Sequence, residues 1–121
     1  GIAGRDAAWH TMALSKVKAH KALKEERPRD AVKHFREFMA TVATSKEEET
    51  SDPSTGIVHS REVILGRNAK RIGDILKGMQ PPDTESANKA YAEAKDYYDK
   101  ALAREQDPAA IEMIRSEMAG L

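Results

Sequence analysis

Proline-containing stops divide this chain into segments whose apolar residues recur with the spacing of α-helices. Pro28, the pair 81–82 and Pro108 each lie where one such segment ends and the next begins. Proline breaks a helix that it interrupts but suits the first turn of a new one. No stretch alternates apolar and polar residues over the length of a strand. The sequence therefore predicts an all-α protein.

We expect four long antiparallel helices and a short C-terminal helix, packed as helical hairpins or as a four-helix bundle. A length of 121 residues fits one helical domain over 1–121. Residues 47–56 are acidic and rich in turn formers, which predicts a mobile surface loop. The expected helices span about 6–26, 28–46, 57–79, 84–104 and 108–119.

Each expected helix has one apolar side, which we assign to the core. The fourth interleaves small and aromatic residues, a pattern that lets two helices approach closely. Gly66 and Gly73 lie seven residues apart on one flank of the third and predict another close approach. The inward residues are Trp9, Ala13, Val17, His20 and Leu23; Ala31, Phe35, Phe38, Met39 and Val42; Val58, Leu65, Ile72, Leu76 and Met79; Ala87, Ala90, Tyr91, Ala94, Tyr98, Ala101 and Leu102; and Ile111, Ile114 and Met118.

The last two segments carry a spaced aromatic pattern. Tyr91, Ala94, Tyr98 and Ala101, followed by Pro108, resemble the second half of a tetratricopeptide (TPR) repeat over residues 84–118. Residues 8–79 are more loosely similar to the three-helix microtubule-interacting and trafficking (MIT) domain. Both resemblances imply TPR-like helix packing and a module that binds peptides or helices of other proteins in grooves.

The chain lacks the motifs of the common catalytic sites. It has no cysteine, no glycine-rich phosphate loop and no serine in a nucleophile elbow. We therefore expect no enzymatic activity and no cofactor. The leading interpretation is a non-catalytic protein-interaction or scaffold module with an unidentified protein or peptide partner.

Six residues are the candidates for a partner groove. Polar residues that fall on the inward side of a helix need a partner or a solvent-filled groove, and exposed aromatic rings can anchor a ligand. An exposed apolar face in the last helix would favour a homodimer instead. The groove candidates are Trp9, His20, Arg61, Asn68, Tyr91 and Tyr97.

A competing hypothesis is a four-helix bundle that holds a metal ion or small ligand through histidine and carboxylate side chains. His34 with Glu37, and His59 with Glu62, stand three residues apart, which places each pair on one side of a helix. Both pairs fall outside the inward stripes, so we expect them to face solvent.

Charge and hydropathy constrain the remaining partners. Arg67, Lys70, Arg71 and Lys77 form a basic outer stripe on the third expected helix, but the chain carries no net charge, so we do not expect nucleic acid as the partner. No run approaches the roughly 18 apolar residues of a membrane span, so we expect no membrane insertion. The sequence leaves the compartment open between the cytoplasm and export after loss of a targeting segment.

Overall fold

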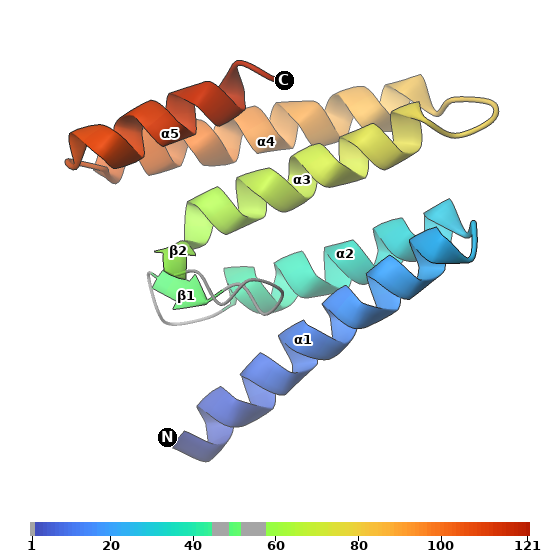
Figure 1. Cartoon of the computed structure of the whole chain (residues 1–121), viewed down its shortest axis with the longest axis horizontal. Coiled ribbons are helices and arrows are strands. Elements are labelled where there is room, and N and C mark those ends of the chain that lie inside the picture. The colour runs from blue at the N-terminus through green and yellow to red at the C-terminus, as the bar shows by residue number, and fades with distance from the viewer. Residues whose placement is uncertain (1, 45–48, 52–57) are drawn as a thin grey trace. The chain divides into compact units, whose positions relative to one another are not determined.

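The chain is helical over most of its length. The computed structural model describes the backbone of residues 2–44, 49–51 and 58–121, and the side-chain surroundings of residues 10–44 and 60–121. This part of the chain confirms the all-α class (Figure 1). The elements are α1 (Ile2–Lys24), α2 (Pro28–Ala43), β1 (Glu49–Ser51), β2 (Val58–Ser60), α3 (Arg61–Lys77), α4 (Thr84–Arg104) and α5 (Pro108–Met118).

The chain divides into two compact units, Gly1–Arg61 and Glu62–Leu121. That all 121 residues form a single domain stays a prediction.

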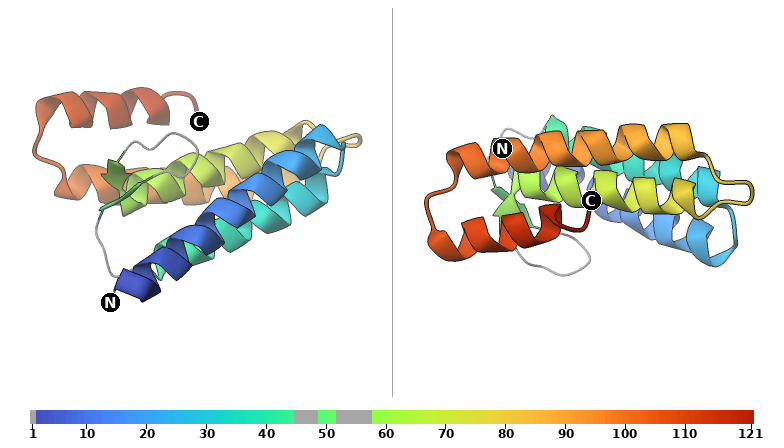
Figure 2. Two further views of the ribbon diagram at one scale, coloured as in Figure 1. Left: turned by 60° about the horizontal axis from the view of Figure 1, so that its bottom comes forward. Right: turned by 90° about the horizontal axis from the view of Figure 1, so that it is seen from above.

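In the first unit α1 and α2 form an antiparallel hairpin (Figure 2). α2 starts at Pro28, which occupies the first turn as expected. Its buried side chains are the five that the sequence predicts: Ala31, Phe35, Phe38, Met39 and Val42. Helical spacing was sufficient here because all the large apolar residues of α2 lie on one side.

The inward side predicted for α1 is wrong. Val17 is 63% exposed, and Leu23 and His20 are also exposed. Apolar residues are scattered around this helix, so spacing alone does not select a face. Small side chains leave room for the phenylalanine rings of α2, which accounts for the face that is buried. That face comprises Met12, Ser15, Lys16, Ala19 and Ala22.

Lys16 is a buried lysine on the α1 face that packs toward α2. Only 3% of the residue is exposed, and its ammonium lies 5.0 Å from the centroid of the Phe38 ring. A cation over an aromatic face is attracted to the electron density of the ring.

The segment before α3 also differs from the prediction. β1 and β2 pair antiparallel, with Thr50 opposite His59. Residues 49–51 of the predicted loop are therefore a strand, and 47–48 and 52–56 lie outside the described residues. α3 begins at Arg61 rather than at 57, so Val58 is not a residue of that helix. A three-residue strand is too short to show an alternating pattern in the sequence.

The ends of the first three helices shift by a few residues. α1 begins at Ile2 and ends at Lys24, and Glu26 has a positive φ of 57° that stops the helix before the predicted residue 26. α2 ends at Ala43 instead of 46. α3 ends at Lys77, and Met79 lies beyond it, half-buried.

The second unit contains α3, α4 and α5, in which α4 is antiparallel to α3 and α5 is antiparallel to α4 (Figures 1 and 2). α3 buries Leu65, Ile72 and Leu76 as predicted. The expected close approach occurs at its two glycines, and aromatic rings of α4 make it. A Cβ placed on Gly66 would lie 3.0 Å from the Tyr98 ring, and one on Gly73 would lie 2.7 Å from the Tyr91 ring.

α4 spans the predicted residues and buries Ala87, Ala90, Ala94, Tyr98 and Ala101, while Tyr91 and Leu102 are half-buried.

Aspartates cap the last two helices. The Asp83 carboxylate accepts from the amide of Ser86 at 3.2 Å, and that of Asp107 from the amide of Ala109 at 3.3 Å.

α5 packs against α4 and ends at Met118, one residue before the predicted end. Ile114 is buried, and Ile111 and Met118 are half-buried, so much of this apolar face is covered within the chain. A homodimer through α5 stays a prediction.

Candidate functional site

The six predicted groove residues fall in both units. Trp9 lies in α1, but its side chain is outside the described part. His20 is exposed, and its ring meets that of Phe35 edge-on with centroids 5.5 Å apart. Arg61 is half-buried and is the last residue of the first unit. That these residues share one groove with those of the second unit stays a prediction.

Three groove candidates belong to the second unit. Asn68 is buried; its amide donates to the carbonyl of Ile64 at 2.8 Å, and its Oδ1 meets no hydrogen-bond donor among the described residues. Tyr97 is half-buried, with the Lys100 ammonium 5.8 Å from its ring centroid.

Tyr91 is held between Gly73 and a carboxylate. Its hydroxyl donates to Asp74 Oδ1 at 2.5 Å. Partial burial, the hydrogen bond and the negative charge of Asp74 raise the pKa of Tyr91 to about 12. Tyr91 is therefore fixed by contacts between α3 and α4.

The two histidine–carboxylate pairs do not form a shared metal site in the described structure. His34 Nδ1 lies 3.1 Å from Glu37 Oε2 on α2. The helical pairing predicted for His59 and Glu62 is wrong, because His59 lies in β2 and Glu62 accepts from Arg104 at 2.7 Å. Among the described residues, no three histidine, aspartate or glutamate side chains gather closely enough to hold a metal ion.

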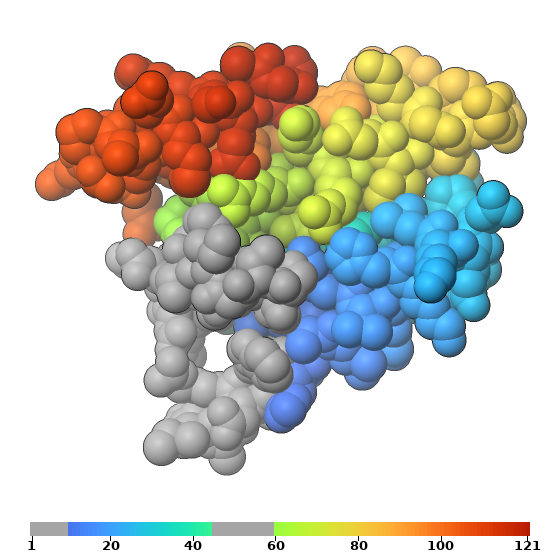
Figure 3. Space-filling view, in the orientation of Figure 1, coloured from blue at the N-terminus to red at the C-terminus, as the bar shows by residue number. Residues whose placement is uncertain are grey.

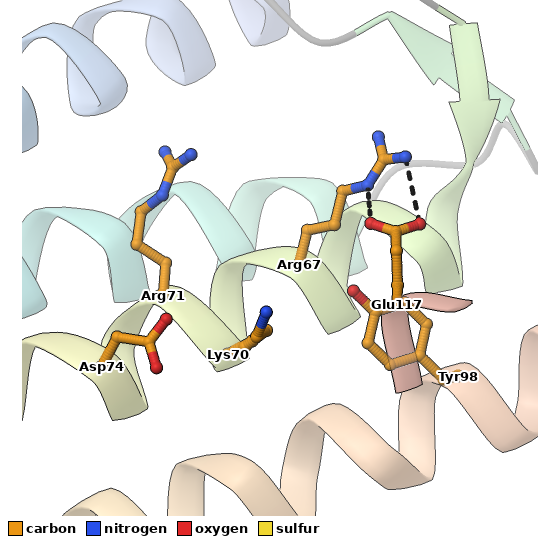
Figure 4. Close-up of a pocket in the computed structure, with 6 residues that line it drawn as sticks. All are labelled: Arg67, Lys70, Arg71, Asp74, Tyr98 and Glu117. Atoms are coloured by element: carbon orange, nitrogen blue, oxygen red, sulfur yellow. Dashed lines mark hydrogen bonds and ion pairs between the residues drawn. The ribbon is translucent and has the colours of Figure 1, made fainter. Parts of the chain in front are cut away.

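A polar pocket of about 290 Å³ in the second unit is the candidate functional site (Figure 4). α3 supplies four of its lining residues, and α4 and α5 supply one each. Figure 3 shows α5 side chains packed against those of α3 on this unit. The lining residues are Arg67, Lys70, Arg71, Asp74, Tyr98 and Glu117.

Helical spacing along α3 sets up the basic side of this pocket. Arg67, Lys70 and Arg71 stand three and four residues apart, so they fall on one side of the helix. The sequence predicts this basic stripe, but on the solvent-facing side of the helix and not in a pocket.

Arg67 is the link between α3 and α5. Its Nε and Nη2 donate to the two Glu117 carboxylate oxygens at 2.5 and 3.1 Å, and Nη2 also lies 3.6 Å from Met113 Sδ. A two-point contact between guanidinium and carboxylate fixes both side chains in one geometry. Glu117 is not among the residues that the sequence pattern predicts for a site. The one signal in the sequence is an acidic residue in the last turn of a helix, where a positive residue is favoured.

Lys70 provides a positive charge that the protein leaves available. The residue is half-buried, and its ammonium makes no hydrogen bond or ion pair in the described part of the chain. It lies beside the end of α5, 3.2 Å from where a Cβ on Gly120 would stand.

Tyr98 adds a buried hydroxyl. The residue is 0% exposed, and no acceptor lies in hydrogen-bonding geometry to its hydroxyl among the described residues. Figure 4 shows the hydroxyl directed from α4 toward the side chains of Arg67 and Lys70. Burial, followed by the negative charge of nearby Glu117 and the approach of its carboxylate to the hydroxyl, raises the pKa of Tyr98.

The pocket has the chemistry of an anion site. Three cationic side chains face two carboxylates, of which Glu117 is paired with Arg67 and Asp74 accepts from Tyr91. An ammonium and a phenol donor therefore remain for a ligand oxygen.

Comparison with known proteins assigns neither a family nor a function to the chain. No protein-family model matches the chain, and no curated protein or solved structure matches it either. The resemblances to TPR repeats and MIT domains therefore stay predictions from the sequence. Of the helices in the described part, none combines the length and the apolar character needed to cross a bilayer.

Proposed function

We propose that this protein is a non-catalytic interaction module that binds acidic side chains of a partner protein at the pocket formed by α3, α4 and α5. The observation that carries the proposal is the unpaired Lys70 ammonium beside the buried Tyr98 hydroxyl. Peptide binding between helices is also what the resemblance to TPR repeats implies.

The lining of the pocket favours binding over catalysis. Arg67, Lys70 and Arg71 are cationic side chains, and such groups attract and orient an anion. The surrounding carboxylates keep the site only modestly positive, which favours a short acidic stretch over a uniformly charged polymer.

A hexaglutamate peptide is a direct probe of this function. We expect it to bind the full chain in isothermal titration calorimetry, and Lys70→Met to weaken the affinity about tenfold, because a hydrogen bond to a charged group contributes about 1.5 kcal/mol. Methionine retains the apolar stem of the side chain while removing the charge.

Lys77→Met is the matched control. It removes the same charge from the exposed last turn of α3, and Lys77 does not line the pocket. The control should bind hexaglutamate as the unmodified chain does. A peptide that fails to bind, or one whose affinity falls equally in both variants, would contradict the proposal.

A further inference from the structure

We infer that the pocket is built for the phosphate group of a phosphorylated side chain in the partner protein. This inference rests on the proposed function and specifies the anion that the site prefers. It follows from where the pocket donors stand, from the carboxylate already bound there, and from the size of the pocket.

The available donors approach the pocket from two helices. Lys70 and its basic neighbours stand on α3, and the Tyr98 hydroxyl reaches in from α4 (Figure 4). A carboxylate is planar and offers two oxygens. A phosphate monoester offers three terminal oxygens in a tetrahedral arrangement, so it can meet the ammonium and the phenol and still direct a third oxygen toward the basic side of α3.

The protein already contains a carboxylate that competes for this site. Glu117 is tethered to α5 and occupies Arg67 with both of its oxygens. A tethered group acts at an effective concentration in the millimolar range or above. A partner carboxylate brings a single negative charge against this competition, whereas a phosphate carries a charge of about −1.5 to −2 at neutral pH.

The pocket is large enough for the head group of one side chain. Its volume of about 290 Å³ is at the lower limit of the roughly 300–1,000 Å³ typical of small-molecule pockets. A phosphorylated side chain fits within it while the rest of the partner lies outside. The unpartnered Tyr98 hydroxyl is the donor that such a ligand would satisfy, since a buried hydroxyl without an acceptor is costly.

The test compares hexaglutamate with the same peptide carrying phosphoserine at its third position. The two peptides differ little in total charge, so a difference in affinity reports on the phosphate group. We expect the phosphopeptide to bind the full chain at least tenfold more tightly. The advantage should shrink as the pH falls from 7.5 to 5, because the second phosphate pKa is about 6.

Tyr98→Phe tests the geometry with little risk to the fold, because the hydroxyl that it removes has no partner in the described structure. It should lower phosphopeptide affinity several-fold and hexaglutamate affinity by a smaller factor. Tyr97→Phe, one residue along α4 and outside the pocket, is its matched control. Glu117→Gln should strengthen phosphopeptide binding, because it removes the competing charge.

The outcomes separate the two proposals. A hexaglutamate peptide that does not bind overturns the proposed function. If hexaglutamate binds through Lys70 and the phosphopeptide binds no more tightly, the preference for phosphate is wrong and the proposed function stands. Inorganic phosphate is the third probe, and if it binds as tightly as the phosphopeptide, the ligand is free phosphate and not a partner side chain.

Discussion

Replacing Gly73 by alanine tests whether the contact between α3 and α4 is as close as the structure shows. An added Cβ would lie 2.7 Å from Tyr91 Cε1 and 2.9 Å from two more atoms of the same ring. Carbon atoms pack best at about 3.5–4.0 Å, so the ring must move by about 1 Å. That movement strains the hydrogen bond from Tyr91 to Asp74, and overpacking of this kind costs about 2 kcal/mol.

Helix propensity changes the free energy of unfolding in the opposite direction. Alanine is better than glycine in a helix interior by about 1 kcal/mol, so Gly73→Ala should lower the free energy of unfolding by about 1 kcal/mol in total. In a Tyr91→Ala background the clash is absent, and the same substitution should raise the free energy of unfolding by about 1 kcal/mol. The predicted coupling between the two positions is therefore about 2 kcal/mol.

Urea unfolding followed by circular dichroism measures all four free energies of this cycle. Tyr97→Ala serves as the control background, because the three atoms nearest the added Cβ all belong to Tyr91. Gly73→Ala should remain destabilising there. Equal effects of Gly73→Ala in the Tyr91→Ala background and in the unmodified chain would refute the close packing of this ring on α3.

Two further perturbations address single residues. The pKa of Tyr91 is about 12 in the folded chain against about 10 when unfolded, so the unfolded state loses its proton first as the pH rises. The free energy of unfolding should therefore fall from pH 10 to 12. Urea unfolding across this range should show a shallower fall in Tyr91→Phe. Asp83→Ala removes the acceptor for the Ser86 amide and should lower the free energy of unfolding by about 1 kcal/mol, seen as a lower midpoint of thermal unfolding. Asp83→Asn should retain most of the cap. Equal decreases of the midpoint in both variants would show that the cap contributes little.

Interactions between residues close in the chain explain why the sequence predicts α2 and α4. Proline and aspartate determine where α2, α4 and α5 begin, through interactions with the next few residues only. The buried sides of α2 and α4 follow from helical spacing, because their large and small residues are segregated around the helix. The close approach at Gly66 and Gly73 also follows, since a missing side chain marks where a neighbour can come near.

Tertiary contacts decided what local patterns left undetermined. The buried face of α1 depends on the Phe35 and Phe38 rings of α2, and the start of α3 depends on the pairing of β2 with β1. Neither partner is visible within the segment concerned. The sequence could therefore give the helices without the face of α1 or the start of α3.

The candidate site shows the same division. The sequence by itself determined that Arg67, Lys70 and Arg71 share one side of a helix, because their spacing matches the helical repeat. Only the tertiary structure decided that this side forms a pocket, by placing Glu117 on Arg67 and the Tyr98 hydroxyl opposite Lys70. These residues stand 28 to 50 positions apart in the chain. Which distant groups lie together depends on how the helices pack, since periodicity within a helix reveals only its own faces.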